Sequence, residues 1–467
     1  MKNYFFYLTF LAHVAFPMHS AAQTPKWHYL GDTTISDEYS QGALMALYEG
    51  TPYVAFGGNC GTGLSTIVKR FNGTDWGMLD TAGLGETHYQ GLGISSSGKP
   101  QLAYFENNKF GLKHLENNVW KTVSESPQMP GSPYHISYAF DDENLFVAFT
   151  DSDLSGQISV WKFDGSDWSV VGQPFVSPGG LASIILKISV GTPWLAYLEP
   201  NSSKACVVKK FDGIDWQSVG GPVFIGTFTH QHNPFVYHTP NIDFAVSNGV
   251  PFIVYTDSTT LYRVSVLKFD GNVWAHVGEP MFTVEDGSAV RIAIDSDDNV
   301  PYVLFKDLDL GISGTSVMRF DGNTWNYVGN RVFSSFYLWS AIFEIQEGIP
   351  FFAYEPSLFC PKVSVLAFSQ ATQVKEPKRF EISFSISQNP VAGDVLKMKI
   401  QSGKESDVVT QISTMEGRVM LENGMHLDTG AFEHQINVGS LANGVYVIQL
   451  KSKDGLDWST KRFVVAR

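Results

Sequence analysis

The stretch Phe163-Asp164-Gly165-Ser166-Asp167-Trp168 decides the fold of this chain, because the chain repeats its pattern. Phe, Asp, Gly, two variable residues and Trp return at residues 211–216, 269–274 and 320–325. The copy at residues 71–76 has Asn in place of Asp, and a degenerate copy at residues 115–120 ends in Trp but lacks the Gly. A spacing of about 50 residues indicates an array of one supersecondary unit.

Each unit reads as four short strands. An alternating segment such as Ala182–Val190 is followed by a Pro-aromatic-apolar segment such as Pro193–Tyr197, and the unit ends in Trp-x-x-Val-Gly. Asp-Gly between apolar runs favours a type I′ hairpin, in which both central residues have positive φ. With 43 glycines and no helical periodicity, the pattern predicts an all-β propeller. We call the strands A to D from the axis outward, so that the Phe ends strand C and the Trp opens strand D.

The two ends of the repeat array are complementary. Trp27 opens a D-type segment with no Phe-Asp-Gly before it, and the last C-type segment, residues 363–368, has no Trp after it. Pairing the two segments would close the ring and remove its sheet edges. We therefore expect a seven-bladed propeller over residues 23–369, with Trp27–Gly31 as the outer strand of the blade built by residues 331–369. The alternative is an open solenoid with two unpaired edges.

Composition limits the classes of function. The net charge of −14 disfavours nucleic acid and anionic membrane surfaces as partners. Residues 1–22 resemble a signal peptide, with Lys2, an apolar run and a small-residue cleavage site at Ser20-Ala21-Ala22. No other apolar stretch reaches the ~20 residues of a transmembrane helix.

The chain has three cysteines, an odd number for an exported protein. Cys60 and Cys360 both fall in the B–C loop, in the first and seventh blades, which become neighbours when the ring closes. A bridge between them is one hypothesis, and two free thiols are the other. Cys206 lies in a predicted C strand, where we expect a buried apolar filler.

A second β pattern follows a polar linker at residues 370–378. Residues 379–467 resemble the C-terminal sorting domain of the type IX secretion system of Bacteroidota, on the following marks: Asn389-Pro390, Glu416-Gly417-Arg418, Gly444-x-Tyr446 and Lys461-Arg462-Phe463-Val464-Val465. The resemblance implies a small β-sandwich that the secretion machinery recognises after export to the periplasm, and a final location that is secreted or at the outer cell surface. The residues that would carry the sorting signal are Asn389, Pro390, Gly444, Tyr446, Lys461 and Phe463.

The candidate binding site lies where the propeller breaks its own symmetry. Counting ten residues back from the Pro that opens strand B gives an unequal polar series near one end of the channel, which we call the top. Polar groups beside aromatic rings suit a carbohydrate ligand. The candidates are Gln90, His135, Asn241, Asp243 and Arg291, with His88, Tyr134 and Trp339 nearby. The alternative is that these side chains merely face water in the channel mouth.

Acidic residues recur two positions after the aromatic that ends strand B, with Glu355 displaced by one. They are Glu106, Asp151, Glu199, Asp257 and Asp307. One interpretation is a rim that binds cations or sugars. The other is that each acid closes its own turn through backbone N–H groups.

The fifth D–A loop is longer than its neighbours and carries three histidines, His230, His232 and His238. A His-x-His pair on one face suits a zinc or copper site. The alternative is a loop packed over the channel mouth.

Catalytic signatures such as Gly-x-Ser-x-Gly and His-Glu-x-x-His are absent from the sequence, and nothing in it demands a cofactor. The repeat resembles kelch-type propellers in length only. We expect non-catalytic recognition of a glycan or surface polymer at the top face. A rival is a secreted polysaccharide hydrolase or lyase that uses acids such as Asp243, Asp295 and Glu344 with His135 or Arg291. A third interpretation is an assembly scaffold.

Overall fold

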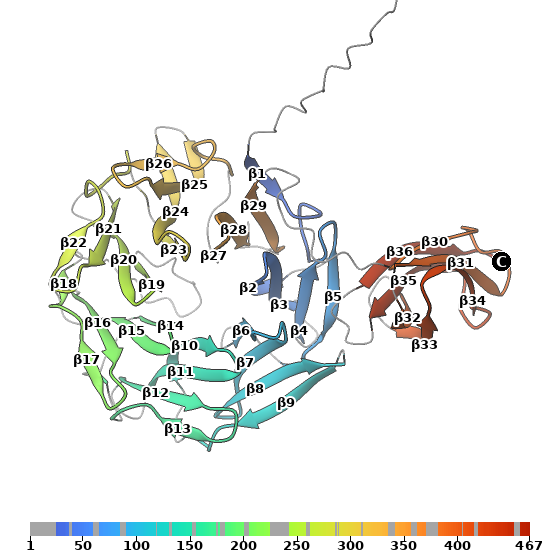
Figure 1. Cartoon of the computed structure of the whole chain (residues 1–467), viewed down its shortest axis with the longest axis horizontal. Coiled ribbons are helices and arrows are strands. Elements are labelled where there is room, and N and C mark those ends of the chain that lie inside the picture. Colours follow the sequence, from blue (N-terminus) through green and yellow to red (C-terminus); the bar gives the residue numbers. More distant parts are fainter. Residues whose placement is uncertain are drawn as a thin grey trace, which may run out of the picture.

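The computed structural model shows a ring of β-sheets with a smaller β domain beside it (Figure 1). It describes residues 25–467 except 37–39, 59–64, 85–89, 118, 130–132, 152–155, 174–175, 178–182, 200–204, 225–241, 258–261, 285–286, 288, 310–311, 335–340, 356–361, 370–381, 404, 415–418 and 453–457.

Within the residues that the structure describes, seven antiparallel sheets form the ring, and each runs from an inner strand to an outer one. The first blade consists of β2 (Ser40–Tyr48), β3 (Thr51–Gly58), β4 (Ser65–Phe71) and β5 (Trp76–Thr81). The second consists of β6 (Gln90–Ile94), β7 (Pro100–Glu106), β8 (Lys109–Glu116) and β9 (Val119–Glu125). The third consists of β10 (Pro133–Asp141), β11 (Asn144–Asp151), β12 (Gln157–Phe163) and β13 (Trp168–Val170). The fourth blade consists of β14 (Ile184–Ser189), β15 (Thr192–Leu198), β16 (Ala205–Phe211) and β17 (Trp216–Ser218), and β18 (Val223–Phe224) also pairs with β16. The fifth consists of β19 (Ile242–Ser247), β20 (Val250–Asp257), β21 (Arg263–Phe269) and β22 (Trp274–His276). The sixth consists of β23 (Arg291–Asp295), β24 (Val300–Asp309), β25 (Ile312–Phe320) and β26 (Trp325–Tyr327).

The seventh blade joins the two ends of the ring. Its strands are β27 (Ala341–Gln346), β28 (Ile349–Tyr354), β29 (Ser364–Ser369) and, from the start of the chain, β1 (Lys26–Tyr29). β1 runs antiparallel to β29, with Trp27 opposite Phe368 (Figure 1). This is the pairing that the complementary ends of the repeat array predict, and the chain forms an all-β propeller.

The Phe-Asp-Gly-x-x-Trp stretch forms the connection between the two outer strands. Phe269 pairs with Trp274, so four residues connect the strands, and Oδ1 of Asp270 accepts the backbone N–H groups of Asn272 and Val273 at 2.8 and 2.9 Å. The predicted type I′ turn is therefore wrong: the Gly alone has positive φ, and the Asp acts by capping backbone donors. These N–H groups also lower the pKa of Asp270. The same capping occurs at Asn72, Asp164, Asp212 and Asp321.

The Trp of one blade fits against the Val-Gly of the blade before it. Nε1 of Trp274 donates to the carbonyl oxygen of Val219 at 3.1 Å, and Nε1 of Trp325 donates to that of Val277 at 2.8 Å. A Cβ added to Gly220 would lie 2.9 Å from Nε1 of Trp274, so only Gly lets the ring approach this closely. The motif is thus a contact between blades as well as a turn signal.

Apolar side chains fill the spaces between neighbouring sheets. The cluster between the third and fourth blades, for example, combines Ala148 and Val160 with Leu195 and Tyr197, all of them buried. Cys206 is buried in the cluster between the fourth and fifth blades, and it is a free thiol. The hydrophobic core is therefore divided into wedges around the ring.

The smaller domain is a sandwich of two antiparallel sheets. One sheet holds β30 (Ile382–Ile386), β31 (Val395–Ser402) and β34 (Gly430–Asn437). The other holds β33 (Val419–Leu427), β32 (Ser406–Thr414), β35 (Gly444–Ser452) and β36 (Trp458–Val465). Its core lies between the sheets and includes Leu396, Ile448 and Phe463, all fully buried. Among the residues that the structure describes, no helix is long and apolar enough to cross a membrane.

Candidate functional site

The inner strands of the blades surround the axis of the ring (Figure 1). Residues directly opposite each other on antiparallel strands point to the same face of the sheet. The strand register therefore shows which inner-strand positions are equivalent from one blade to the next. The second strand of each blade carries a Pro near its start, or Leu145 in the third blade. The inner-strand residues that pair with the third residue after this position form what we call the upper ring: Leu44, Gly91, Ser137, Ile185, Asp243, Arg291 and Ile342. Residues opposite the first position after it form the lower ring: Ala46, Gly93, Ala139, Lys187, Ala245, Ala293 and Glu344.

Polar members of the upper ring reach the backbone of the next blade. Oγ of Ser137 accepts the N–H of Leu186 at 2.9 Å, and Oδ2 of Asp243 accepts that of Ile292 at 3.0 Å. Oδ1 of Asp243 accepts the N–H of Phe244 at 2.9 Å. These side chains therefore satisfy N–H groups of the inner strands.

Arg291 also belongs to the upper ring, but its side chain donates to backbone carbonyl oxygens instead of accepting backbone N–H groups. Its Nε donates to the carbonyl oxygen of Ala341 in the seventh blade at 2.8 Å, and its Nη1 donates to that of Val290 at 2.9 Å. Burial lowers the pKa of Arg291, and the nearby charge of Asp243 opposes that shift. Two backbone carbonyls thus fix the guanidinium, and no carboxylate within the described part of the chain forms an ion pair with it.

Lys187 and Glu344 are the two charged members of the lower ring. Among the described residues, neither side chain takes part in a hydrogen bond or an ion pair. Burial raises the pKa of Glu344, the positive charge of Lys187 lowers it, and the negative charge of Asp243 raises it. Glu344 keeps some exposed surface yet is surrounded by protein, as expected for a group in the wall of a channel. Lys187 on β14 and Glu344 on β27 are therefore close enough to interact electrostatically.

The charges occupy one part of the ring. Lys187, Asp243, Arg291 and Glu344 lie in the fourth to seventh blades, whereas the first three blades contribute only Ser137 and small or apolar residues at these levels. We call these four side chains the charged quartet. Unpaired charges held close to protein are costly, so they mark candidate functional sites.

The structure corrects the placement of Gln90. In most blades four residues separate the paired ends of strands A and B, as between Ile188 and Pro193, but the second blade has five, Ser95–Lys99. Counting back from Pro100 therefore lands on the opposite face of the strand. Gln90 is buried against the first blade, where its Oε1 accepts a hydrogen bond from Oγ1 of Thr66 at 2.8 Å.

A longer turn also changes the level of Arg291 in the ring. Six residues separate Ile294 from Pro301, which puts Arg291 level with Asp243. His135 lies at the bulge in β10, half-buried, and its backbone N–H donates to Oγ1 of Thr150 at 3.1 Å. The other predicted site residues, His88, Asn241 and Trp339, lie outside the described residues, as does the side chain of Tyr134.

Two of the recurring acids are buried, and neither closes its own turn. Asp307 accepts hydrogen bonds from Nε and Nη2 of Arg331 at 2.9 and 2.8 Å and from Oγ of Ser316 at 2.8 Å. Oε1 of Glu355 accepts the backbone N–H of Ala43 at 2.8 Å and so links the seventh blade to the first. Burial raises the pKa of Glu355 to about 7, although the N–H groups of Ala43 and Gly42 oppose this shift.

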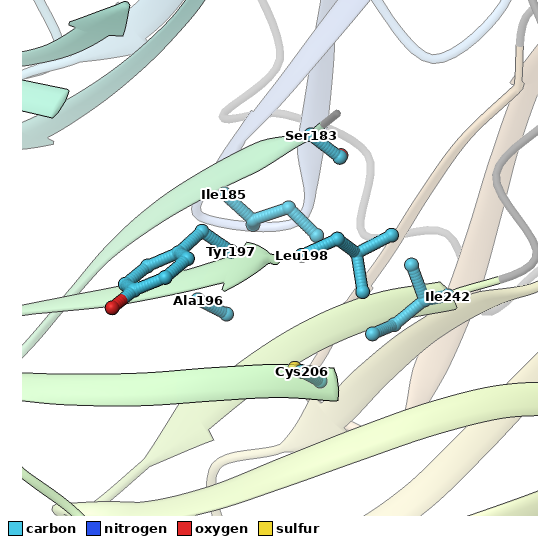
Figure 2. A pocket seen from close by; sticks show the side chains of 7 residues that line it. All are labelled: Ser183, Ile185, Ala196, Tyr197, Leu198, Cys206 and Ile242. Atoms are coloured by element: carbon cyan, nitrogen blue, oxygen red, sulfur yellow. The ribbon is translucent and has the colours of Figure 1, made fainter. Parts of the chain in front are cut away.

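Other candidate sites are weaker. No cluster of three or more His, Cys, Asp or Glu in the described ranges could hold a metal ion, and the predicted His230, His232 and His238 lie outside those ranges. Cys60 and Cys360 lie outside them too. Figure 2 shows a pocket between the fourth and fifth blades with room for about one water molecule. Its lining is largely apolar and includes Ile185, Leu198 and Ile242, so it offers little for a ligand to recognise.

The predicted sorting residues gather along β36. Asn389 accepts the backbone N–H of Val464 on its Oδ1 at 2.8 Å, and Tyr446 lies opposite Phe463 with ring centroids 5.8 Å apart. Gly444 opens the strand that pairs with β36. Lys461 and Pro390 are exposed.

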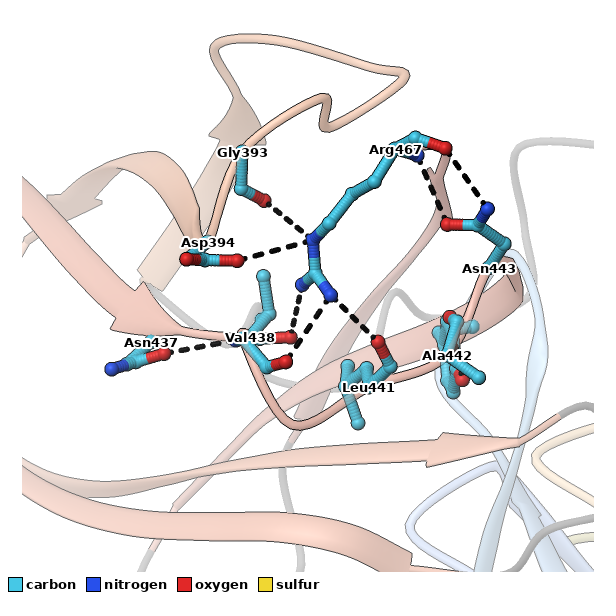
Figure 3. Close-up of polar contacts among 10 residues, drawn as sticks. Gly393, Asp394, Asn437, Val438, Leu441, Ala442, Asn443 and Arg467 are labelled. Atoms are coloured by element: carbon cyan, nitrogen blue, oxygen red, sulfur yellow. Dashed lines mark hydrogen bonds and ion pairs between the residues drawn. The ribbon is translucent and has the colours of Figure 1, made fainter.

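Arg467 connects this strand to two loops (Figure 3). Its guanidinium donates to the carbonyl oxygens of Val438, Gly439 and Leu441 at 2.6, 3.1 and 3.0 Å, and it pairs with Asp394 at 3.2 Å. Its backbone N–H donates to Oδ1 of Asn443 at 2.9 Å. The end of β36 is therefore held in one conformation by polar contacts.

Comparison with known proteins identifies this domain. Residues 389–466 match the family described as the secretion system C-terminal sorting domain. This match shows that the chain is handled by the type IX secretion machinery and exported to the cell surface or secreted. No curated protein matches the chain.

Solved structures resemble the chain at low identity. PorZ, a surface component of the type IX secretion system of Porphyromonas gingivalis, is 14% identical with a TM-score of 0.41, and the match covers 91% of this chain and 59% of that one. The polysaccharide lyase Uly1 is 10% identical with a TM-score of 0.44 over 74% of this chain and 92% of that one. The β-propeller domain of the Trilobed protease from Pyrococcus furiosus is 11% identical with a TM-score of 0.48 over 73% and 99%. These likenesses concern the fold alone, and the chain spans about three-fifths of PorZ.

Proposed function

We propose that this exported propeller, which carries a type IX sorting domain at residues 389–466, recognises a glycan or surface polymer without transforming it. The signal peptide at residues 1–22 would bring the chain to the periplasm. The propeller would then present one end of its channel to the ligand outside the cell.

The charged quartet is the observation that supports this proposal. A channel wall that serves only to hold the blades together would be expected to look similar in every blade. Here, Arg291 is fixed by the carbonyl oxygens of Ala341 and Val290, and Lys187 and Glu344 have no ion-pair partner among the described residues. Polar groups that are already held in position favour binding of a polar ligand. His135, at the bulge of β10, and the predicted aromatic residues of the top loops would add to the same site.

A polysaccharide hydrolase is the second candidate. Burial raises the pKa of Glu344, the charge of Lys187 opposes this shift and the charge of Asp243 adds to it, and a raised pKa is the direction that a general acid requires. Its partner, however, would be Asp243, whose two carboxylate oxygens already accept backbone N–H groups at 2.9 and 3.0 Å. Recognition without catalysis requires no second carboxylate free to act as a base or nucleophile.

The test is binding of the purified full chain to a panel of polysaccharides, with Asp243→Asn/Arg291→Met as the site variant. Arg319→Met is the matched control, because Arg319 lies in the same blade and pairs with Asp298 at the solvent-exposed surface at 3.3 Å. We expect the site variant to lose binding and the control to keep it. Product analysis of bound polymers separates recognition from hydrolysis. Absence of binding by the folded chain would contradict the proposal and favour a scaffold.

A further inference from the structure

The guanidinium of Arg291 has donors left for a ligand. An Arg side chain carries five N–H donors, and the contacts with Ala341 and Val290 use one on Nε and one on Nη1. Nη2 has no partner among the described residues. Nη1 and Nη2 therefore each keep a donor without a partner among the described residues, and a fork of these two nitrogens can bind a carboxylate in bidentate geometry.

The backbone contacts set the orientation of that edge before any ligand arrives. Carbonyl oxygens from two different blades hold Nε and Nη1 at 2.8 and 2.9 Å, so the guanidinium cannot rotate freely. Ordering a flexible Arg normally opposes binding, and a fork that is already ordered avoids this loss. The two partners of this Arg are neutral carbonyls, so no carboxylate among the described residues is directly paired with it.

Lys187 places a second positive charge two residues deeper in the ring, in the lower ring of the fourth blade. It has no ion-pair partner in the described ranges, and it is close enough to Glu344 to lower the pKa of that carboxyl. Asp243 is occupied by the N–H groups of Phe244 and Ile292. Among the described residues, Arg291 therefore keeps unused donors, and the side chains of Lys187 and Glu344 make no hydrogen bond, although the chain as a whole carries a net charge of −14.

We infer that the ligand is an acidic glycan, and that Arg291 binds a sugar carboxylate in bidentate form while Lys187 interacts with the next acidic residue of the polymer or with a hydroxyl. Glu344 would accept hydroxyl hydrogen bonds from the same sugars. This inference rests on the proposed recognition function and names the chemical class of its ligand. A uronate-bearing polysaccharide is the simplest polymer of that class.

The experiment measures binding of the full chain to polygalacturonate and alginate, to the same polymers with esterified carboxyl groups, and to neutral polysaccharides. Esterification keeps the sugar backbone and removes the negative charge. We expect it to weaken binding about tenfold to a hundredfold, because a charge-assisted pair is lost. Arg291→Met should have the same effect on the acidic polymer and little effect on the esterified one.

Lys187→Met and Lys121→Met provide a matched pair. Lys187 makes no hydrogen bond among the described residues, so its replacement leaves the backbone contacts of the channel intact. Lys121 pairs with Glu116 at 3.1 Å on the exposed outer strand β9, far from the inner strands in the sheet order. Binding should weaken in the first variant, stay unchanged in the second, and be preserved or strengthened in Glu344→Gln.

The outcomes separate this inference from the proposed function. Equal binding of acidic and esterified polymers, or binding of acidic polymers that survives both Arg291→Met and Lys187→Met, overturns the acidic ligand and leaves glycan recognition standing. Binding to neutral polysaccharides alone does the same. Failure of the folded chain to bind any polymer overturns both.

Discussion

Substituting Gly220 tests whether the Trp-x-x-Val-Gly motif joins neighbouring blades. Gly220 has φ of +67°, and an added Cβ would lie 2.9 Å from Cε2 of Phe269 and 2.9 Å from Nε1 of Trp274. Gly191, in a turn of the fourth blade, has the same φ of +67° but nothing within 4 Å of its would-be Cβ. The two glycines therefore have the same φ and differ in what would surround an added Cβ.

Two effects set the expected loss of stability: the left-handed backbone conformation and the contact of the new methyl group with the aromatic rings. Placing Ala in the left-handed region costs about 1–2 kcal/mol of folding free energy at either site. At Gly220 the new methyl group must also displace two aromatic rings in a packed interface, which costs a further ~1–3 kcal/mol. We expect Gly220→Ala to lower the free energy of unfolding of the propeller by about 2 kcal/mol more than Gly191→Ala.

The assay is equilibrium unfolding of the full chain in urea, followed by tryptophan fluorescence, for the wild type and the two variants. The m-value should stay unchanged while the midpoint falls further for Gly220→Ala. A larger red shift of the native emission is expected in the same variant, because Trp274 moves. Equal destabilisation by the two substitutions would refute the argument that close packing of Trp on Gly holds the blades together.

Three further perturbations address polar groups that connect separate segments of the chain. The pKa of Glu355 in the fold is about 7, above its ordinary 4.5, so the stability contributed by its protonated form is complete below pH 4.5 and lost as the pH rises through 7. Glu355→Gln does not titrate, and its unfolding free energy relative to wild type should therefore rise by up to about 3 kcal/mol between pH 4.5 and pH 8; a pH-independent difference would contradict this. Asp307→Asn should destabilise the propeller by about 3 kcal/mol, because it leaves the partly buried Arg331 without its carboxylate partner; urea unfolding measures this, and an effect no larger than that of the exposed Asp298→Asn would contradict it. Arg467→Ala should lower the melting temperature of the sorting domain, with a loss of about 1–3 kcal/mol, because three backbone carbonyls lose their donor; secretion should fall in parallel, and the exposed Arg462→Ala is the control.

The repeat pattern was a reliable guide to the fold because its signals are local. Each Asp of the Phe-Asp-Gly-x-x-Trp stretch caps the N–H groups of the second and third residues after it, and the Trp is held by the Val-Gly of the preceding repeat. The same pattern misled on turn type, since a type I′ hairpin and a four-residue loop share the Asp-Gly signal. Positive φ at the Gly is common to both.

Counting along the sequence was less reliable for the candidate site. A turn longer by one residue put Gln90 on the opposite face of β6, and a turn longer by two brought Arg291 level with Asp243. Lys187 was not singled out at all, although it replaces the Ala or Gly that most blades have at its level. A comparison of the blades by strand register would have found it, but register depends on turn lengths that composition does not reveal.

By itself, the sequence determined the repeated unit, the closing of the ring by its two ends, the sorting domain and the direction of export. These follow from periodicity, from turn residues and from a family resemblance, all of which act over short stretches of chain. Only the tertiary structure decided that Lys187, Asp243, Arg291 and Glu344 lie close enough to interact electrostatically, and that Glu355 accepts the backbone N–H of Ala43 where the seventh blade meets the first. The physical reason is that electrostatic interaction and desolvation depend on distances through space, which ring closure sets between residues far apart in the chain.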